Sequence, residues 1–405
     1  MAPRRCRAVS ARPSRRAPVA DGSARRSGSS PAAMTRIALY ASQLAPGGPT
    51  GIHRYVTEIT RALFAVHPDR YRLLASSETA EPIWLPRDIP IRRLPGPRRA
   101  LHLAWYLARY PKIERFSPDA DLVHVLSPTF PVPSRKPIVY TLHDLQHLED
   151  AGAFRRRESR LGIAALKDAA KRAAMIVAVS GAVADAAEDR LGIERARITV
   201  VHHGISDRFR VTLPESTLAE VCSRFGVERG GYFVCVGKVE LRKNVTTLVR
   251  AAALKPHTIR LLVVGPRGFG AEEVDAEIEQ RGVGADVTLI GHVSDNDLIA
   301  LIAGARALVH PSGFEGFGFT PLEAMALGTP AIASRAGSLP EVLGNGALLL
   351  DGIDAEAWST AMIRLQQDHA FADSLAERGR RHAAMFTWER AARETAAVHE
   401  LVTRD

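Results

Sequence analysis

Two glutamates flank a loop of glycine and aromatic residues late in the chain, and they are its first candidates for chemistry. Glu315 opens the loop and Glu323 follows it, with seven residues between them. The loop comes after a short apolar run, Ala307–His310, which has the pattern of a buried parallel strand. Thr320 is the predicted N-cap of a helix whose first residue is Pro321. A glycine loop that runs from a strand into a helix N-terminus presents free backbone N–H groups, which suit a phosphate.

Each glutamate also has an ordinary structural interpretation. Glu323 stands three residues after Thr320 and could complete a capping box. Glu315 has no capping role, but single loop glutamates are common on protein surfaces. A second strand, Thr329–Ser334, and a second helix that begins near Ser338 repeat the arrangement. Two adjacent strand–turn–helix units predict a doubly wound α/β crevice that binds a ligand.

The run EGFGFTPLEAMALGTPAIAS, residues 315–334, resembles the E-x7-E signature of retaining glycosyltransferase family 4, the mannosyltransferase-like group 1 glycosyltransferases. That family has the GT-B fold, in which two Rossmann-like domains of doubly wound parallel sheet face a central cleft. The resemblance implies that Glu315 is catalytic and lies by the donor sugar and its phosphate, while Glu323 holds the nucleotide ribose. It also assigns donor binding to the loop residues, which are Gly316, Phe317, Gly318 and Phe319.

Cations follow another predicted strand. The strand Tyr232–Gly237 ends in glycine and is followed by Lys238, Arg242 and Lys243. Cations at the carboxyl ends of a parallel sheet suit an anion, although a solvated charge cluster is the alternative. The stretch resembles the family's G-x-x-E-x-RKN pattern, which implies that Arg242 and Lys243 neutralise the donor diphosphate during catalysis. Gly237 and Lys238 are expected to bind the donor.

A histidine ends a strand in the N-terminal half. His143 follows the predicted strand Ile138–Leu142 and precedes Asp144. From spacing alone, a structural histidine hydrogen-bonded to Asp144 is expected. The stretch VYTLHDLQHLED resembles the family's histidine motif, and this resemblance implies that His143 contacts the hydroxyl groups of the donor sugar.

Two further segments are candidate donor contacts. The glycine loop between the first predicted strand and the first predicted helix contains Gly48 and Gly51, and its pattern fits a phosphate loop or a plain tight turn. It resembles the family's GG-x-x-G-x-x-RY loop, which implies that both glycines close over the diphosphate. His292 and Val293 follow the predicted strand 286–291, where related enzymes read the nucleotide base through the backbone.

The reaction implied by the resemblance transfers a hexose with retention of its anomeric configuration. No aspartate-x-aspartate motif stands at the end of a predicted strand to hold a metal, so the cations are expected to replace Mg²⁺, with no metal and no other cofactor. GDP-mannose is the first candidate donor, and UDP- and dTDP-sugars stay open. A glycan or lipid-linked acceptor of surface polysaccharide synthesis is expected. A non-catalytic relative that binds sugar nucleotides, and another GT-B enzyme such as an epimerase, are the alternatives.

Composition and charge narrow the class of protein. The 405 residues suggest two domains, three cysteines are too few for a disulfide framework, and no apolar run is long enough to cross a bilayer, so a cytoplasmic protein is expected. The net charge is +10, but residues 1–33 hold eight arginines and one aspartate, or +7, which leaves +3 for the remainder (10 − 7). This basic tail has no apolar signal region and is predicted to be disordered or to precede a native start at Met34. A nucleic-acid-binding protein is therefore not expected, although a nucleic-acid arm or a transit peptide is the alternative for the tail.

The predicted domains are an acceptor domain over residues 34–210, a donor-nucleotide domain over 211–385, and a helix over 386–405 that crosses back to the acceptor domain, as in the family. A polar linker is predicted over 205–230. Residues 82–116 form a basic amphipathic segment. The ordinary interpretation is that this segment forms a solvated face. The alternatives are that it contacts the anionic inner face of the membrane or that it lines an acceptor groove.

Overall fold

The computed structural model describes residues 35–44, 51–79, 91–127, 131–145, 156–254 and 259–404, apart from the side chains of Gln43 and residues 156–161. The basic tail predicted for residues 1–33 and the loop residue Gly48 lie outside these ranges.

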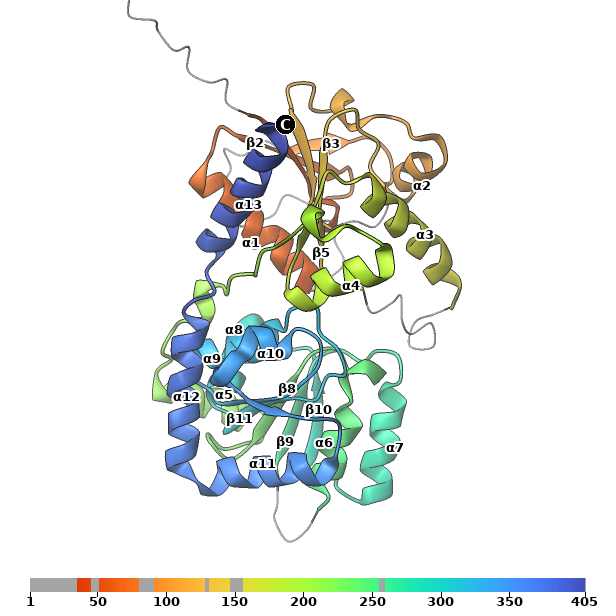
Figure 1. Ribbon diagram of the computed structural model, residues 1–405. Helices are drawn as coiled ribbons and strands as arrows, with labels where there is room; N and C mark the ends of the chain where they lie inside the picture. Colours follow the sequence, from red (N-terminus) through yellow and green to blue (C-terminus); the bar gives the residue numbers. More distant parts are fainter. Residues whose placement is uncertain are drawn as a thin grey trace, which may run out of the picture. The chain divides into compact units, whose positions relative to one another are not determined.

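The N-terminal half is built on a sheet of seven parallel strands, in the order β3-β2-β1-β4-β5-β6-β7 (Figure 1). The inner strands β1, β4, β5 and β6 are short apolar runs that are buried along their whole length, as parallel strands between two helix layers must be. The strands are β1 (Ile37–Tyr40), β2 (Tyr71–Ser76), β3 (Ile91–Leu94), β4 (Leu122–Val125), β5 (Ile138–Leu142), β6 (Met175–Ala178) and β7 (Ile198–Val200). The helices are α1 (Gly51–Val66), α2 (Arg98–Ala108), α3 (Arg156–Arg172) and α4 (Gly181–Leu191).

The C-terminal half is built on a second parallel sheet, of six strands in the order β10-β9-β8-β11-β12-β13. Its strands are β8 (Phe233–Val236), β9 (Leu261–Val264), β10 (Val287–Gly291), β11 (Ala307–His310), β12 (Ala331–Ser334) and β13 (Leu348–Leu350). Its helices are α5 (Glu215–Arg224), α6 (Val245–Ala252), α7 (Ala271–Arg281), α8 (Asp295–Ala303), α9 (Phe319–Leu327), α10 (Leu339–Leu343), α11 (Ala355–Gln367) and α12 (His369–Ala383). No helix of the described residues is both long and apolar enough to cross a membrane.

Both sheets reverse their strand order at an interior pair of strands. The reversal lies between β1 and β4 in the first sheet and between β8 and β11 in the second. At such a point the connections leave in opposite directions, which opens a crevice at the carboxyl ends of the strands. The loop that follows β8 and the loop that follows β11 therefore face each other, and these loops carry the predicted cations and glutamates.

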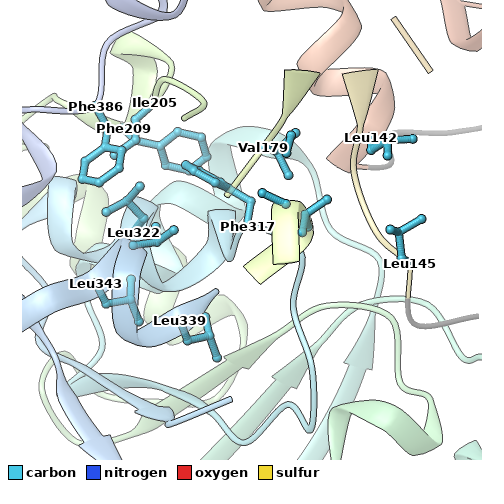
Figure 2. Packing of buried hydrophobic residues seen from close by; sticks show 14 of the residues in the cluster. Leu142, Leu145, Val179, Ile205, Phe209, Phe317, Leu322, Leu339, Leu343 and Phe386 are labelled. Atoms are coloured by element: carbon cyan, nitrogen blue, oxygen red, sulfur yellow. The ribbon is translucent and has the colours of Figure 1, made fainter. Parts of the chain in front are cut away.

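One apolar cluster contains residues of both halves, and Figure 2 shows part of it. Phe317 lies near its middle, with Phe209 and Phe386 on one side and Val179 toward the other. Phe317 belongs to the loop after β11, whereas Val179 follows β6 of the first sheet. The loop that carries the candidate site is therefore also part of the packing that joins the two halves.

The last helix, α13 (Trp388–Arg404), returns to the N-terminal half and packs against α1 (Figure 1). A buried hydrogen bond of 2.9 Å joins His399 Nε2 on this helix to His124 Nδ1 on β4. The hydroxyl of Tyr71 lies 3.4 Å from the other ring nitrogen of His399. Burial is the main reason that both histidines have a lowered pKa, which is about 3 for His124 and well below the usual range for His399.

The structure corrects one predicted element and adds one that was not predicted. The polar linker predicted over 205–230 contains the helix α5, which buries Leu218, Val221 and Cys222 in the cluster described above. Their spacing of three and one is helical, but polar neighbours and Pro214 concealed it. The helix α12 was not predicted.

The start of α9 also differs from the prediction. The helix begins at Phe319, and its N-cap is Gly318, with a left-handed φ of 93° and no capping hydrogen bond from a side chain. The left-handed φ favours glycine, and a Cβ on Gly318 would also lie 2.5 Å from a methyl carbon of Leu339, which would have to move. Thr320 is consequently inside the helix, and Glu323 does not complete a capping box.

We predict that the buried pair His124–His399 makes the free energy of unfolding fall as the pH is lowered. Both groups are neutral in the folded protein, whereas the unfolded chain binds protons below about pH 6.5. Stability is therefore full above that pH and falls below it, by up to about 1.4 kcal/mol per pH unit for each such histidine. We expect His399→Gln to lower stability at about pH 8 and to reduce the loss per pH unit below about pH 6.5, measured by urea unfolding at each pH. His67→Gln, at an exposed position, is the control, and equal slopes for wild type and His399→Gln would contradict the prediction.

Candidate active site

A cavity of about 500 Å³ lies at the carboxyl ends of strands from both sheets. Its walls come from α1 and the residues after β5 in the N-terminal half, and from the residues after β8, β9, β10 and β11 in the C-terminal half. The predicted site residues that line it are Gly51, His143, Gly237, Lys238, Arg242, Lys243, His292, Val293, Glu315, Gly316, Phe317, Gly318 and Phe319. The structure thus brings together residues that lie up to 268 positions apart in the sequence (319 − 51).

Glu315 is the centre of a charge cluster in this cavity. Its Oε1 forms an ion pair with the ammonium of Lys243 and lies 3.6 Å from Nη1 of Arg242. The imidazole of His310, the last residue of β11, lies 3.0 Å from the same oxygen. The side chains of Glu315 and Lys243 are only 14% and 13% exposed, so each charge depends on the other.

The protonation of this cluster follows from burial and charge. Burial alone would raise the pKa of Glu315, but Lys243, the hydrogen bond from His310 and Arg242 outweigh it and hold that pKa well below its usual range. Burial lowers the pKa of His310, with Lys243 and Arg242 acting in the same direction, and this exceeds the opposing effect of Glu315. A neutral His310 donates to an ionised Glu315, so the carboxylate is held as a fixed negative charge.

A second carboxylate, that of Glu240, contacts Arg242 as well and is also close to Lys238. Glu240 accepts a hydrogen bond of 2.6 Å from Nε of Arg242, and its other oxygen lies 3.7 Å from the ammonium of Lys238. The three cations and two carboxylates of this part of the cleft carry one net positive charge. A bound diphosphate would meet an electropositive wall whose side chains are already oriented.

His143 is packed between the two halves of the molecule. Its Nε2–H donates to the carbonyl oxygen of Leu126 at 2.8 Å, and burial lowers the pKa of His143 to about 4. The side chain is neutral at physiological pH. Gly316 packs on the backbone of His143, because a Cβ at Gly316 would lie 1.8 Å from the His143 carbonyl oxygen. The hydroxyl of Ser180 donates to the Gly316 carbonyl at 2.7 Å, which fixes the same loop from α4.

His203 is the centre of an aromatic cluster that also joins the halves. Its ring stacks on Phe319 with centroids 5.1 Å apart and an angle of 8°, and on Trp388 at 5.7 Å. Tyr55 of α1 lies 4.5 Å away, and Phe317 lies 4.7 Å away. Phe317 and Phe319 therefore pack against His203 of the connecting segment, Phe319 also packs against Trp388 of α13, and Tyr55 of α1 supports the cluster through His203.

Glu341 provides a further contact between the halves. Its carboxylate accepts hydrogen bonds from the backbone N–H of Gly181 at 2.8 Å and from Nε2 of His202 at 2.6 Å. It thereby occupies the N-terminus of α4, where a negative charge is favourable.

Glu323 is almost fully buried next to residues that line the cavity. The residue is 2% exposed, and its carboxylate forms an ion pair with Arg54 of α1, which does line the cavity. The structure therefore pairs Glu323 with a residue of the N-terminal half that the sequence interpretation did not select, and the ribose contact stays a prediction.

The end of the cavity beyond β10 contains His292 and Val293, together with Asp295 and Leu298. Asp295 forms an ion pair with Arg208, which precedes the C-terminal half. Asp295 begins an aspartate-x-aspartate pair that ends at Asp297, but both carboxylates lie in the first turn of α8 and each is paired with an arginine. Within the described part of the chain, no group of three or more histidine, cysteine, aspartate or glutamate residues is arranged to hold a metal ion.

Several residues of the site were missed from the sequence, among them Glu240, which lies between Lys238 and Arg242 in the chain. His310 is the last residue of a buried strand, and His143 comes directly after one, so both stand at strand ends. Arg54 stands in the first turn of α1, within the glycine-loop pattern. His203 had no signal, because its neighbours come from four separate segments.

Two parallel sheets whose switch-point loops share one cavity define the GT-B class of fold. A family model described as "Glycosyl transferases group 1" matches residues 226–382, and one described as "Glycosyltransferase Family 4" matches residues 49–209. The chain therefore belongs to the group 1, family 4-like glycosyltransferases. The resemblance noted in the sequence is confirmed.

Curated relatives match part of the chain. It is 34% identical over 187 residues to O-antigen chain mannosyltransferase B of Escherichia coli, across 45% of this chain and 49% of that one. It is 31% identical over 273 residues to D-inositol 3-phosphate glycosyltransferase of Salinispora arenicola, across 63% of this chain and 61% of that one. The chain thus spans between about half and three-fifths of the length of these relatives.

Solved structures share the fold. A crystal structure of Anabaena Alr3699/HepE in complex with UDP and glucose matches with a TM-score of 0.71 at 20% identity, across 90% of this chain and 99% of that one. At this identity the likeness concerns the fold alone. It confirms the predicted GT-B architecture.

We predict that Lys243 and Glu315 stabilise the fold as a pair. Lys243→Met leaves a buried carboxylate with weaker partners, and we expect it to lower the free energy of unfolding by about 3–5 kcal/mol. The double variant Lys243→Met/Glu315→Gln is expected to lose less than the sum of the single losses, measured by urea unfolding in a double-mutant cycle. The matched control is Arg335→Met with Asp351→Asn, an exposed ion pair that we expect to be worth at most about 1 kcal/mol. Additive losses at Lys243 and Glu315 would contradict the prediction.

Proposed function

We propose that this protein is a glycosyltransferase that moves mannose from GDP-mannose to a glycan or lipid-linked acceptor in surface polysaccharide synthesis. The proposed reaction retains the anomeric configuration and needs no metal ion. The observation that carries the proposal is the cluster of Glu315, Lys243 and Arg242 at the switch point of the second sheet, on the wall of a cavity lined by both halves.

The geometry supports this chemistry through charge. As the bond between the sugar C1 and the β-phosphate oxygen breaks, the electron pair leaves with the diphosphate, and Lys243 and Arg242 stabilise the new negative charge. The N-terminus of α9, which follows the glycine loop, adds backbone N–H groups and a positive dipole. The acceptor oxygen forms its bond to C1 on the same face, and its proton passes to an oxygen of the departing phosphate. Glu315 acts here as a fixed negative charge beside the electron-poor sugar carbon.

The choice of mannose and GDP is supported by the relative whose name describes mannose transfer in O-antigen chains. Asp295 at the far end of the cavity adds a chemical argument, because its carboxylate, besides its ion pair with Arg208, has lone pairs that can accept N–H groups of the guanine edge. UDP- and dTDP-sugars are the competing donors, since the Anabaena structure holds UDP and glucose.

The alternative functions predict other products. A GT-B epimerase would convert one sugar nucleotide into another, and a non-catalytic relative would leave the donor intact. The proposed transferase forms GDP together with a mannosylated acceptor or, slowly, free mannose. Incubation with GDP-mannose, followed by NMR of the sugar signals, separates the three.

We propose in addition that the protein works in the cytoplasm, in contact with the inner face of the membrane. The observation behind this is an exposed apolar row on and after α2, in which Leu103, Leu107 and Tyr110 are 48%, 70% and 59% exposed. Cations such as Arg99 and Lys112 lie in the same segment. Apolar side chains that enter the acyl boundary beside cations that face anionic headgroups are the usual means of peripheral binding.

The nucleotide part of the proposal predicts a selective thermal shift. We expect GDP to raise the melting temperature more than UDP, dTDP or ADP, because a ligand that binds only the folded state stabilises it by mass action. The shift is expected to be the same with Mg²⁺ and with EDTA, and to be lost in Lys243→Met but kept in Arg335→Met. A larger shift with UDP would indicate a UDP-sugar as the donor in place of GDP-mannose. A shift that requires Mg²⁺ would refute the proposal that no metal is needed. No shift with any nucleotide would refute the proposed function.

The membrane part predicts a loss of vesicle binding. We expect Leu103→Ser/Leu107→Ser to reduce co-sedimentation with phosphatidylglycerol vesicles by about tenfold or more, since each buried leucine is worth about 1.5–3 kcal/mol. Leu401→Ser, an exposed leucine on α13, is the matched control and should bind as the wild type does. Equal binding by the double variant and the control would exclude α2 as the contact.

A further inference from the structure

Three side chains hold Arg54 in place, and the proposed reaction gives Arg54 no role. Its guanidinium forms an ion pair with Glu323 and lies 5.5 Å from the ring centre of Phe209 and 6.0 Å from that of Phe319. The side chain is 22% exposed, and this exposed part faces the cavity. Arg54 lies in the first turn of α1, where the positive end of the helix dipole repels a cation. Another interaction must therefore favour an arginine at this position.

Glu323 has only this one side-chain partner among the residues that the structure describes. Its Oε1 is the atom that contacts Arg54. Because the side chain is 3% exposed, the carboxylate has almost no water to replace a lost partner. Among the described side chains, none forms a hydrogen bond with its second oxygen, so this oxygen can accept one from a ligand.

The pair also connects the two halves at one edge of the cavity. Arg54 belongs to α1 of the N-terminal half, and Glu323 belongs to α9 of the C-terminal half. The first residue of α1 is close as well, since a Cβ on Gly51 would lie 3.6 Å from the ring of Phe319. The first turns of α1 and α9 are therefore in contact where the ion pair forms.

We propose that Arg54 is a positioning residue for the nucleotide ribose: it orients the Glu323 carboxylate so that the free oxygen accepts the ribose hydroxyl groups. Recognition of the ribose then depends on a side chain from the half that holds the acceptor. The inference rests on the proposed function, because it requires a sugar nucleotide in this cavity. It goes beyond that function in naming Arg54 and in making the donor site a product of both halves.

Arginine suits this task better than lysine. Its planar guanidinium can lie against two aromatic rings and still present N–H donors in a fixed direction, whereas a lysine ammonium is a point charge on a flexible chain. Lysine at position 54 should keep the charge of the pair but orient Glu323 less well.

The experiment compares each nucleotide with a form that lacks the ribose hydroxyl groups. Binding of GDP and of 2′,3′-dideoxy-GDP, and of UDP and its dideoxy form, is measured by calorimetry on the full chain. We expect the wild type to prefer the ribose form by about tenfold or more, the usual worth of hydrogen bonds to a charged group. In Arg54→Met this preference is expected to fall to about twofold or less through weaker binding of the ribose form, while the dideoxy form binds as before. Arg54→Lys should lie between, and Arg61→Met, an exposed arginine on the same helix, should match the wild type.

Two further variants separate positioning from damage to the fold. Glu323→Gln is expected to lose the same preference, and Arg54→Met/Glu323→Gln, which removes both charges of the buried pair, should lose no more than Glu323→Gln alone. General damage would weaken the dideoxy form as much as the ribose form.

The outcomes distinguish this inference from the proposed function. An unchanged preference in Arg54→Met overturns the role of Arg54 while nucleotide binding stands. A preference that rises would show that Arg54 competes with the ribose for Glu323, which also overturns it. A wild type that binds neither GDP nor UDP overturns the proposed function and this inference with it.

Discussion

A carboxylate held among cations at the carboxyl ends of a parallel sheet is the constraint on which this structure depends. Glu315 is nearly enclosed, and an unpaired charge in such a place would cost several kcal/mol. Lys243 and His310 compensate for it, and both come from segments that the sheet brings to the switch point between β8 and β11. The order of strands in the second sheet therefore determines whether the charges of the site can be buried at all.

The loop that carries Glu315 is also the surface on which the N-terminal half rests. Gly316 packs on the His143 carbonyl without room for a side chain, and Phe317 and Phe319 pack on His203. Backbone contact, aromatic stacking and the Glu341 carboxylate at the N-terminus of α4 all act at this boundary. Because the same loop lines the cavity, the positions of the two halves and the shape of the site are one property of the molecule.

Much of the fold follows from local pattern. The short, mostly apolar runs 138–142 and 307–310 were predicted as strands with the bounds that the structure shows, because a parallel strand covered on both faces is apolar at most positions. The helix α5 was missed since its three buried residues lie among polar ones and after a proline. The start of α9 was misplaced since Gly318 adopts a left-handed φ, a conformation that Thr320 and Pro321 do not announce.

By itself the sequence determined two parallel α/β units, the family, and which residue types stand at the strand ends, because periodicity and motif are local properties of a chain. It could not determine which charges pair. Lys243 and Arg242 were assigned to a phosphate, and the structure shows that both also contact Glu315, 72 and 73 positions away (315 − 243 and 315 − 242). Glu323 was assigned to a cap or to the ribose, and the structure pairs it with Arg54 from the other half. These partners were decided only by the tertiary structure, because burial makes a lone charge costly and the packing of distant segments alone decides which opposite charge lies within reach.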